Sequence, residues 1–461
     1  MVLSSSELGR PAVSLADHTI KRQELRKGRR VALLACYPLR DAAMPPQFIS
    51  NHGMRMVEAT LRASELDGLE VRVWDLQHTE TDALTQELLD YDPDVIGFSA
   101  FMWSFDMFIS VAERLKRDDP RRLIVFGGPS ARASMFALLP YQRAKEFVDV
   151  LVINEGETAF TEIVTAKDRS ISQLQTIFGL AIPAIHGWIE TPERPLADLS
   201  ELASPYKMGL VPKGGIGVLQ TYRGCPFTCS FCEWGTLESP KRVRNSDDLC
   251  EEFAAMEANG IRGSLLVDAG LNLNPHGFKN LMKAAEQSRF FEDKYLISEV
   301  YPAKVKDEHL EFLSMVGTPL VGIGLQSFDN KVLSHVERAY DEARFEKTLQ
   351  DLRDVSSVAI EIILGLPGDT PENFRKSFER ARSLPCALRV YHCVVLPSAL
   401  MVRAPENYKM TFDPYSLKMQ SCLGWTAESL QQEMDFVTER AAVEHGDVGE
   451  YFWVFPPPHY L

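Results

Sequence analysis

The sequence predicts an α/β protein with two domains in series, a Rossmann-like first domain and a partial (β/α)6 barrel, followed by a small C-terminal helical tail. Short apolar runs alternate with amphipathic segments in two separate blocks. This alternation is typical of parallel sheets wrapped by helices. A stretch with frequent prolines divides the blocks, and the length of 461 residues suits about two to four domains.

The first domain is predicted over residues 30–165. Strands are expected at residues 31–36, 71–75, 95–99, 123–126 and 150–153, and helices at residues 54–65, 82–90, 105–115 and from Thr158 onward. Ligands of such sheets bind at the carboxyl ends of the strands. The candidate binding loops are therefore residues 37–50, 100–104, 127–130 and 154–157.

Residues 166–212 are predicted to be a linker, because prolines are frequent there and interrupt regular structure. The barrel is predicted over residues 213–404. Its strands are expected at residues 216–221, 263–267, 295–300, 320–325, 359–364 and 388–395. Residues 405–461 form the tail, with a helical pattern at residues 427–444.

Composition excludes several classes of protein. The net charge of −15 opposes a nucleic-acid surface as the main partner, because phosphate binding needs a basic field. No apolar run reaches the ~18 residues of a membrane span, and the basic residues near the start do not precede a signal-like apolar run. Eight cysteines in a long chain do not suggest a disulfide framework. We expect a cytoplasmic protein without nucleic-acid or membrane partners.

The most informative motif is a group of three cysteines that follows the first predicted barrel strand. Cys225, Cys229 and Cys232 have the spacing C-x3-C-x2-C. Three thiolates on one tight loop can hold three irons of a four-iron cluster, which leaves the fourth iron open for a ligand. A zinc site and three merely packed cysteines are the alternatives. The compressed spacing, together with Gly224 and Pro226, favours the cluster.

This loop resembles the signature loop of the radical S-adenosylmethionine (SAM) superfamily, in which an aromatic residue such as Phe231 precedes the last cysteine. The resemblance implies a [4Fe-4S] cluster whose open iron binds SAM. Further segments are similar to SAM-contacting segments of that superfamily, including Gly322-Ile323-Gly324-Leu325-Gln326-Ser327 and Glu361-Ile362-Ile363-Leu364-Gly365-Leu366. The SAM contacts implied by the resemblance are Phe231, Asp268, Glu299, Gln326, Ser327 and Leu366. The loop at Asp268 departs from the commoner glycine-rich form of that segment.

The first domain resembles the cobalamin-binding domain that precedes the barrel in one large radical SAM class. The similar stretches are residues 94–99, 124–130 and 148–157. The cobalamin contacts implied are Arg40, Ser99, Phe101, Gly127, Gly128, Pro129, Glu155, Gly156 and Glu157. The Asp-x-His-x-x-Gly pattern that gives cobalt a histidine in other cobalamin proteins is absent, as is usual in this class. A Rossmann-like domain that binds no ligand, or another cofactor, is the alternative. A nicotinamide is disfavoured, because no G-x-G-x-x-G loop is present.

The tRNA-modifying methylthiotransferases share this domain order, but they hold a second cluster on N-terminal cysteines. Here Cys36 is the only cysteine before the barrel, so such a cluster cannot form.

The resemblance implies a cobalamin-dependent radical SAM enzyme, most simply a methyltransferase that acts on carbon of a small natural-product or amino-acid-like molecule. Such an enzyme uses one SAM to methylate cobalt and a second to generate the substrate radical, with the substrate expected between the two domains and electrons supplied by a donor such as flavodoxin or ferredoxin. The alternatives are rearrangement or ring contraction, non-radical methylation of an indole such as tryptophan, and, in another class, a cobalamin or redox sensor. Candidate substrate contacts, together with the terminal aromatic residues, are Glu233, Trp234, Tyr391 and His392.

Overall fold

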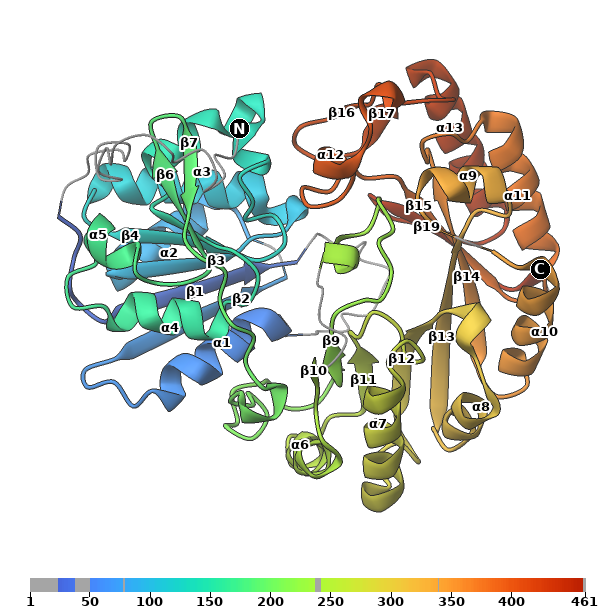
Figure 1. Cartoon of the computed structure of the whole chain (residues 1–461), viewed down its shortest axis with the longest axis horizontal. Helices are drawn as coiled ribbons and strands as arrows, with labels where there is room; N and C mark the ends of the chain where they lie inside the picture. Colours follow the sequence, from blue (N-terminus) through green and yellow to red (C-terminus); the bar gives the residue numbers. More distant parts are fainter. Residues whose placement is uncertain (1–23, 38–49, 78, 237–241, 339, 459–461) are drawn as a thin grey trace. The chain divides into compact units, whose positions relative to one another are not determined.

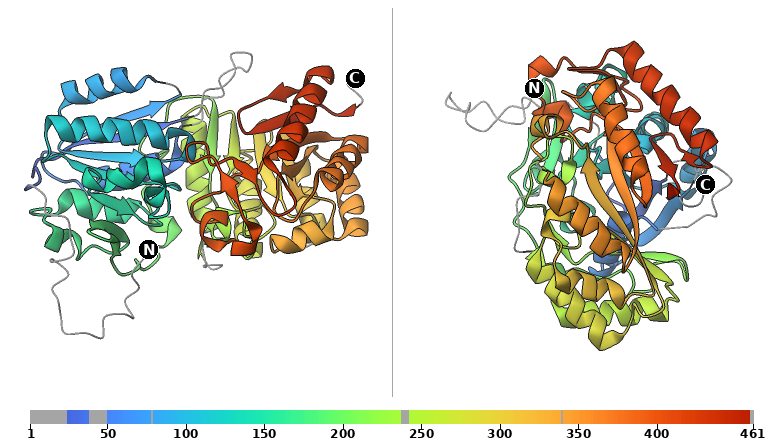
Figure 2. Two further views of the ribbon diagram at one scale, coloured as in Figure 1. Left: turned by 90° about the horizontal axis from the view of Figure 1, so that it is seen from above. Right: turned by 90° about the vertical axis from the view of Figure 1, so that its right-hand side faces the viewer.

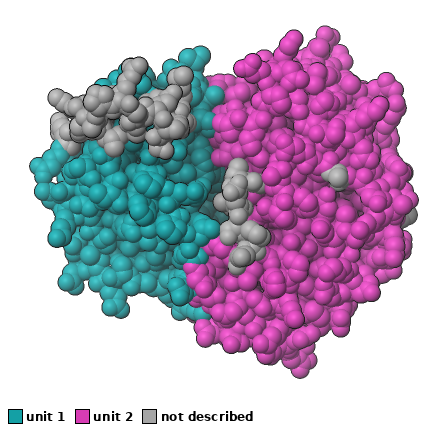
Figure 3. All heavy atoms as spheres, in the orientation of Figure 1, with its two compact units in different colours: residues 1–39, 50–197, 201–211 teal, residues 40–49, 198–200, 212–461 magenta. Residues whose placement is uncertain are grey.

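The computed structural model describes residues 24–37, 50–77, 79–236, 242–338 and 340–458. The chain divides into two compact units, which Figure 3 colours separately. The first unit comprises residues 1–39, 50–197 and 201–211, and the second comprises residues 40–49, 198–200 and 212–461.

The first unit contains a seven-stranded sheet with the order β2-β1-β3-β4-β5-β6-β7 (Figure 1). Strands β1 to β5 are parallel, and β6 and β7 are antiparallel to their neighbours. The strands are β1 (Arg30–Cys36), β2 (Glu70–Leu76), β3 (Val95–Ser99), β4 (Leu123–Gly127), β5 (Val150–Val152), β6 (Leu180–Ala184) and β7 (Gly187–Glu190). The predicted parallel sheet is confirmed.

Alternating side chains of these strands bury both faces of the sheet. Val31, Leu33 and Val125 point to one face, where they pack in a core with α1 (His52–Ala63) and α4 (Glu157–Thr165). On the other face Phe98 and Phe126 contact aromatic residues of α3 (Met102–Asp118), while α2 (Thr81–Tyr91) packs beside α3. Burial on both faces explains why the inner strands β1, β3, β4 and β5 are apolar runs, whereas the edge strand β2 alternates polar and apolar residues.

Residues 166–212, predicted to be a linker, instead include α5 (Ile171–Leu174) and the hairpin β6–β7, which extends the first sheet. The frequent prolines misled the prediction, and one of them, Pro183, lies within β6, although proline cannot donate a ladder hydrogen bond. In the structure β6 pairs with β5 through Leu180 and Ala181 alone, so Pro183 lies beyond that pairing. The first domain is therefore longer than the sequence predicted.

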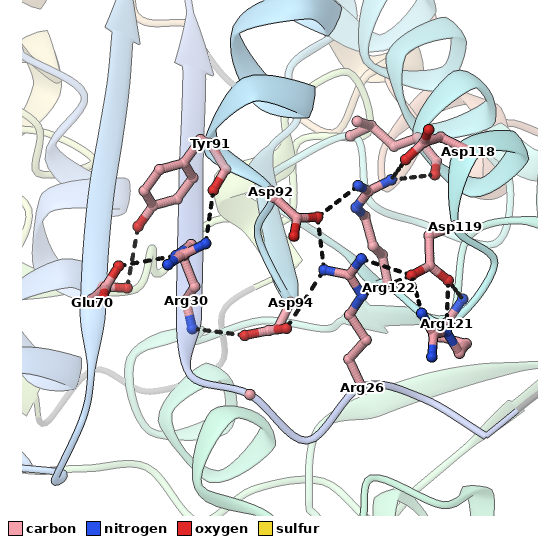
Figure 4. Close-up of polar contacts among 12 residues, drawn as sticks. Arg26, Arg30, Glu70, Tyr91, Asp92, Asp94, Asp118, Asp119, Arg121 and Arg122 are labelled. Carbon is pink, nitrogen blue, oxygen red and sulfur yellow. Dashed lines mark hydrogen bonds and ion pairs between the residues drawn. The ribbon is translucent and has the colours of Figure 1, made fainter.

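An ionic network joins the segment before β1 to the amino ends of β3 and β4 (Figure 4). Arg26 donates to Asp119 Oδ2 and Asp92 Oδ1, each at 2.8 Å, and Arg121 donates to both oxygens of Asp119. Arg122 also binds Asp92, at 2.8 Å. Arginine partners, above all Arg121, hold the pKa of Asp119 well below its usual range. Because this network lies at the amino ends of the strands, it leaves the carboxyl ends of the strands free for binding a ligand.

The Asp119→Asn substitution should therefore lower the free energy of unfolding of the first unit by about 2 kcal/mol at neutral pH, since charge-assisted hydrogen bonds are lost. A carboxylate with a depressed pKa stabilises the fold above its unfolded pKa of about 4, and the contribution disappears as pH falls through the folded pKa. Urea unfolding should show a constant difference from wild type between pH 7 and about pH 4, and a shrinking one below. The control is Asp67→Asn on an exposed turn. An undiminished difference in acid would contradict this account.

The second unit contains an eight-stranded sheet with the order β18-β19-β15-β14-β13-β12-β11-β8. Six of these strands are parallel, as the barrel prediction required. They are β8 (Ile216–Leu219), β11 (Gly263–Leu266), β12 (Tyr295–Val300), β13 (Thr318–Gln326), β14 (Ser357–Leu364) and β15 (Ala387–His392). Helices line the outside of this curved sheet in Figures 1 and 2. They are α6 (Ser246–Ala258), α7 (Pro275–Ser288), α8 (Asp307–Ser314), α9 (Asn330–His335), α10 (Glu342–Arg353) and α11 (Pro371–Ser383).

The C-terminal tail has the predicted helix, α13 (Ala427–Val443), which packs against α11. It also contains strands that the sequence analysis did not predict. β19 (Phe452–Phe455) pairs antiparallel with β15, and β18 (Asp447–Val448) pairs with β19. The terminal aromatic residues therefore extend the edge of the barrel sheet. Among the described residues, no helix has the length and apolar character needed to cross a membrane.

Candidate functional site

The cysteine loop follows the first barrel strand, as predicted. The short strand β9 (Tyr222–Arg223) leads into Gly224, whose φ of +110° favours glycine. Cys229 is buried, Cys225 and Cys232 are partly exposed, and none of the three forms a disulfide. Burial raises the pKa of the Cys225 thiol. Within the described ranges no group of three or more His, Cys, Asp and Glu side chains is arranged around a single metal ion. A four-iron cluster does not demand such convergence, because each thiolate binds a different iron.

Asp268 supports the stem of this loop from the carboxyl end of β11. Its Oδ1 accepts from the backbone N–H of Thr221 at 2.8 Å and of Tyr222 at 3.2 Å, and its Oδ2 contacts Thr221 Oγ1. Burial raises the pKa of Asp268 to about 7. The predicted role was a SAM contact. These bonds instead support a positioning role, because both oxygens are engaged by the stem.

An aromatic and cationic stack lies beside the cysteine loop. Phe227 of the loop stacks on Tyr301, with ring centroids 4.6 Å apart, and the Arg338 guanidinium lies 5.1 Å from the Tyr301 ring centroid. Arg338 also reaches Cys229 Sγ at 3.9 Å and donates to the carbonyl of Gly324 on β13. A positive charge therefore lies against one of the three cysteines.

The inner face of the barrel carries polar side chains next to glycines. Glu361 lies opposite Gly324 and Arg389 in the ladder, so these residues share a face. A Cβ at Gly322 would overlap the Glu299 carboxylate, and one at Gly324 would lie 2.8 Å from Gln326 Nε2. Both glycines thus leave room for polar groups. Gln326 itself has a φ of +76° at an irregularity in the ladder, a strained conformation of the kind found at ligand sites.

The charged side chains on this face interact with one another. Arg389 Nη1 donates to Glu361 Oε1 at 3.0 Å and lies 3.9 Å from Glu299 Oε1, and Tyr391 Oη donates to Glu361 Oε1 at 3.2 Å. Burial and the Glu361 carboxylate raise the pKa of Glu299 well above its usual range. The arrangement can hold a polar ligand with hydroxyl or cationic groups.

Other predicted positions have structural partners. Ser327 Oγ accepts from the Asp329 N–H at 3.1 Å, and Leu366 is fully buried while its carbonyl accepts from Trp425 Nε1. His392 is buried, with Nδ1 2.9 Å from the Cys393 carbonyl. These bonds do not favour His392 as a substrate contact. Another aromatic candidate, Trp234, is 38% exposed and therefore remains accessible to a ligand.

In the first unit the loops after β3 and β4 meet at the carboxyl edge of the sheet. The Ala100 N–H donates to the Gly127 carbonyl at 2.8 Å, and the Ser130 N–H donates to the Ala100 carbonyl at 3.0 Å. Gly128 has a φ of +90°, and a Cβ there would lie 2.8 Å from the Ala100 carbonyl oxygen. Close approach of the loops after β3 and β4 therefore depends on Gly128.

The remaining predicted residues of this edge are placed as follows. Phe101 stacks on Trp103 with centroids 4.7 Å apart, and Ser99 Oγ lies 3.4 Å from Asn51 Oδ1. Gly156 precedes α4, with the buried Glu157 as its first residue. A Cβ at Gly127 would meet nothing nearer than 3.9 Å. Arg40 lies outside the described residues. The glycine-rich edge leaves room for a flat ligand to approach the backbone.

Sequence reasoning missed three arginines: Arg338, Arg389 and Arg403. Arg389 had a usable signal, because polar residues alternate with apolar ones along β15, which marks one face of a strand. Arg338 and Arg403 had none, since their contacts with the cysteine loop span 109 and more than 170 residues of sequence.

Comparisons with known families match both domains. The profile of the radical SAM superfamily matches residues 219–381, and that of the B12 binding domain matches residues 42–164. The chain joins a B12-binding domain to a radical SAM domain. The cofactors of this combination are a [4Fe-4S] cluster with SAM in the barrel and cobalamin in the first domain. The three thiols on one loop and the glycine-rich sheet edge provide donors and space that fit these groups.

Two curated relatives have methyltransferase names. A 2-(S-pantetheinyl)-carbapenam-3-carboxylate methyltransferase from Streptantibioticus cattleyicolor is 28% identical over 346 residues, which is 68% of this chain and 49% of the relative. The cobalamin-dependent radical SAM methyltransferase TokK from Streptomyces tokunonensis is 26% identical over 73% of this chain and 51% of the relative. The chain thus spans about half the length of the curated relatives it matches.

Two solved structures have a similar fold. The radical SAM methyltransferase TsrM from Kitasatospora setae, with tryptophan and a SAM analogue bound, superimposes with a TM-score of 0.66 at 17% identity, covering 90% of this chain and 89% of TsrM. The cobalamin-dependent radical enzyme OxsB gives a TM-score of 0.66 at 13% identity, covering 91% of this chain and 68% of OxsB. At these identities the likeness concerns the fold.

Proposed function

We propose that the protein is a cobalamin-dependent radical SAM methyltransferase that transfers a methyl group to carbon of a small molecule. The observation that carries this proposal is a loop of three free cysteines at the carboxyl edge of a partial barrel, in a chain that also has a B12-binding domain. Both curated relatives have methyltransferase names, and the name of the Streptantibioticus cattleyicolor enzyme gives a carbapenam carboxylate as its substrate. TsrM was solved with tryptophan, another small molecule that bears a carboxylate.

We assign Cys225, Cys229 and Cys232 as the cluster ligands. When bound, the cluster and SAM supply a carbon radical, and cobalamin supplies a carrier for the methyl group. The polypeptide binds and orients these groups. Glu299 and Gln326 lie on the inner barrel face, where a carboxyl and an amide can hydrogen-bond ribose hydroxyls, and Phe231 and the backbone at Leu366 complete the proposed SAM site.

For cobalamin we propose the sheet edge formed by Ser99, Phe101, Gly127, Gly128, Pro129 and the segment from Glu155 to Glu157. Its backbone groups and glycines allow a large flat ligand to lie against the loops. The electron donor, of flavodoxin or ferredoxin type, and the reducing cytoplasm as compartment follow from the need for a reduced cluster. The acidic charge of −15 supports the absence of a nucleic-acid partner.

The activity test uses anaerobically reconstituted protein, a chemical reductant and SAM labelled in its methyl group, with two probes: tryptophan and 2-(S-pantetheinyl)-carbapenam-3-carboxylate. The proposal predicts 5′-deoxyadenosine, and labelled carbon in a probe that the enzyme accepts. Labelled indole without 5′-deoxyadenosine would replace the proposal with non-radical methylation. An unlabelled isomer would indicate rearrangement, and neither 5′-deoxyadenosine nor labelled product would point to a sensor.

Gly128→Ala tests the cobalamin edge by itself. The positive φ and the clash with Ala100 should distort the loop that carries Phe101, and a strain of about 1–3 kcal/mol corresponds to a loss of affinity of about 5- to 160-fold. Cobalt per chain should fall, whereas iron per chain should not. Gly68→Ala is the matched control, because Gly68 also has a positive φ, +69°, but no neighbour within 4 Å. Unchanged cobalt affinity in Gly128→Ala would count against this edge as the binding site.

A further inference from the structure

The second half of the cysteine loop is tied to a segment that follows α9. The Ser230 N–H donates to the Val336 carbonyl at 3.2 Å, and Thr228 Oγ1 donates to Glu337 Oε2 at 2.8 Å. Arg338 contacts Cys229 Sγ at 3.9 Å. This side of the loop is thus held by neighbours within the matched radical SAM region.

A second segment, residues 398–403, holds the loop from a part of the chain beyond that region. Arg403 is the last residue of the short helix α12 (Leu400–Arg403). Its Nη1 donates to the Thr228 carbonyl at 3.3 Å, and its Nη2 donates to the carbonyls of Cys229, at 3.1 Å, and Cys232. The Ser398 N–H donates to Glu233 Oε1 at 2.9 Å, just after the last cysteine. One guanidinium therefore spans the loop from Thr228 to Cys232.

We infer that Arg403 is a positioning residue for the iron–sulfur cluster. Arg403 fixes the spacing of Cys229 and Cys232, and its charge tunes the reduction potential of the cluster. The inference rests on the proposed function, because it takes these cysteines as the ligands. A rigid planar guanidinium that binds several carbonyls orients a loop more firmly than a flexible ammonium does. Groups that orient metal ligands in this way affect affinity by about 10- to 100-fold.

The charge of Arg403 has a second effect. Reduction adds negative charge to a cluster, and cluster potentials respond to nearby net charge and hydrogen bonding. A guanidinium bound to the backbone of two ligand residues should favour the reduced form. Its removal should make the midpoint potential more negative. A purely structural tie between residues 398–403 and the barrel would leave that potential unchanged.

The experiment compares Arg403→Gln, Arg403→Lys and the wild type after identical anaerobic reconstitution. Arg353→Gln is the charge-matched control, since Arg353 donates to Gln350 Oε1, at 3.5 Å, on α10. The measurements are the midpoint potential of the cluster and the rate at which its absorbance is lost in air. For Arg403→Gln we expect a more negative potential than in the control, and loss of the cluster about tenfold faster.

Arg403→Lys keeps the charge but loses the planar fork. We expect its potential to stay near that of wild type while its cluster is lost faster. If Arg403→Gln retains too little cluster for a potential, its instability supports the positioning role, and a potential in Arg403→Lys that is clearly different from wild type would contradict the charge effect. Wild-type potential in Arg403→Gln, or wild-type cluster lifetime in both variants, would overturn the inference. Failure of the wild type to hold a cluster would instead overturn the proposed function.

Discussion

Cys229→Ala is expected to abolish the cluster and, with it, the reductive cleavage of SAM. Cys229 is the buried member of the three cysteines. Its Sγ lies 3.9 Å from Arg338 Nη1, and its backbone carbonyl accepts a hydrogen bond from Arg403 Nη2. Removing one of three ligands costs more than removing a supporting partner, so 5′-deoxyadenosine formation should fall by more than about 100-fold. Iron analysis and product chromatography after anaerobic reconstitution measure the two effects.

The matched control for this substitution is Cys250→Ala. Cys250 lies on α6, where its Sγ contacts the Ala284 carbonyl and the Gln287 side chain, and it carries the same chemical change. Its iron content and SAM cleavage should equal those of wild type. Normal iron content in Cys229→Ala, or loss of iron in Cys250→Ala, would mean that the ligands have been misassigned.

Asp268→Ala is expected to have the next largest effect, on the stability of the barrel and on cluster retention together. The substitution leaves the N–H groups of Thr221 and Tyr222 and the Thr221 hydroxyl without their acceptor. Unpaired buried donors are costly, so the free energy of unfolding of the barrel unit should fall by about 3 kcal/mol. Chemical unfolding measures this change, and iron content after gel filtration shows whether the cysteine loop has loosened.

Asp268→Asn gives the same site a different test. An amide has the shape and hydrogen-bonding pattern of a protonated carboxyl, so this variant should keep most of the stability. The pKa of Asp268 is raised to about 7, above its unfolded value of about 4. Between these two pKa values the Asp268 carboxyl is protonated in the folded state and ionised in the unfolded state. The free energy of unfolding of the wild type should therefore fall as pH rises from about 4 to about 7. That loss should be smaller in Asp268→Asn. Parallel pH profiles for the two proteins would contradict the raised pKa.

Much of the fold was predictable because its signals are local. Apolar runs marked the inner strands β1, β3, β4 and β5, and glycines marked the loops at Gly224 and Gly128, both of which have a positive φ in the structure. The hairpin β6–β7 was missed because the frequent prolines of residues 166–212 suggested a linker, and only the pairing shows that β5 does not need an N–H at Pro183. The pairing of β19 with β15 joins residues more than 60 positions apart, which no local pattern indicates.

The site was predictable to the extent that it is one contiguous motif. The cysteine spacing and the strand before it identified the loop. The residues that hold the loop were not predictable, because Asp268, Arg338 and Arg403 act through contacts made only in three dimensions. Burial also argues against one candidate substrate contact. His392 lies at the end of a strand, but its ring is buried and its Nδ1 lies against the backbone carbonyl of Cys393.

The most direct test of the two-cofactor account is the iron and cobalt content of the chain after anaerobic purification with cobalamin supplied. The account predicts about four irons and about one cobalt per chain, and predicts that the triple variant Cys225→Ala, Cys229→Ala, Cys232→Ala loses the iron but keeps the cobalt. Four irons without cobalt would leave a radical SAM protein and contradict cobalamin-dependent methyl transfer. Iron retained by the triple variant would contradict the assigned cluster site.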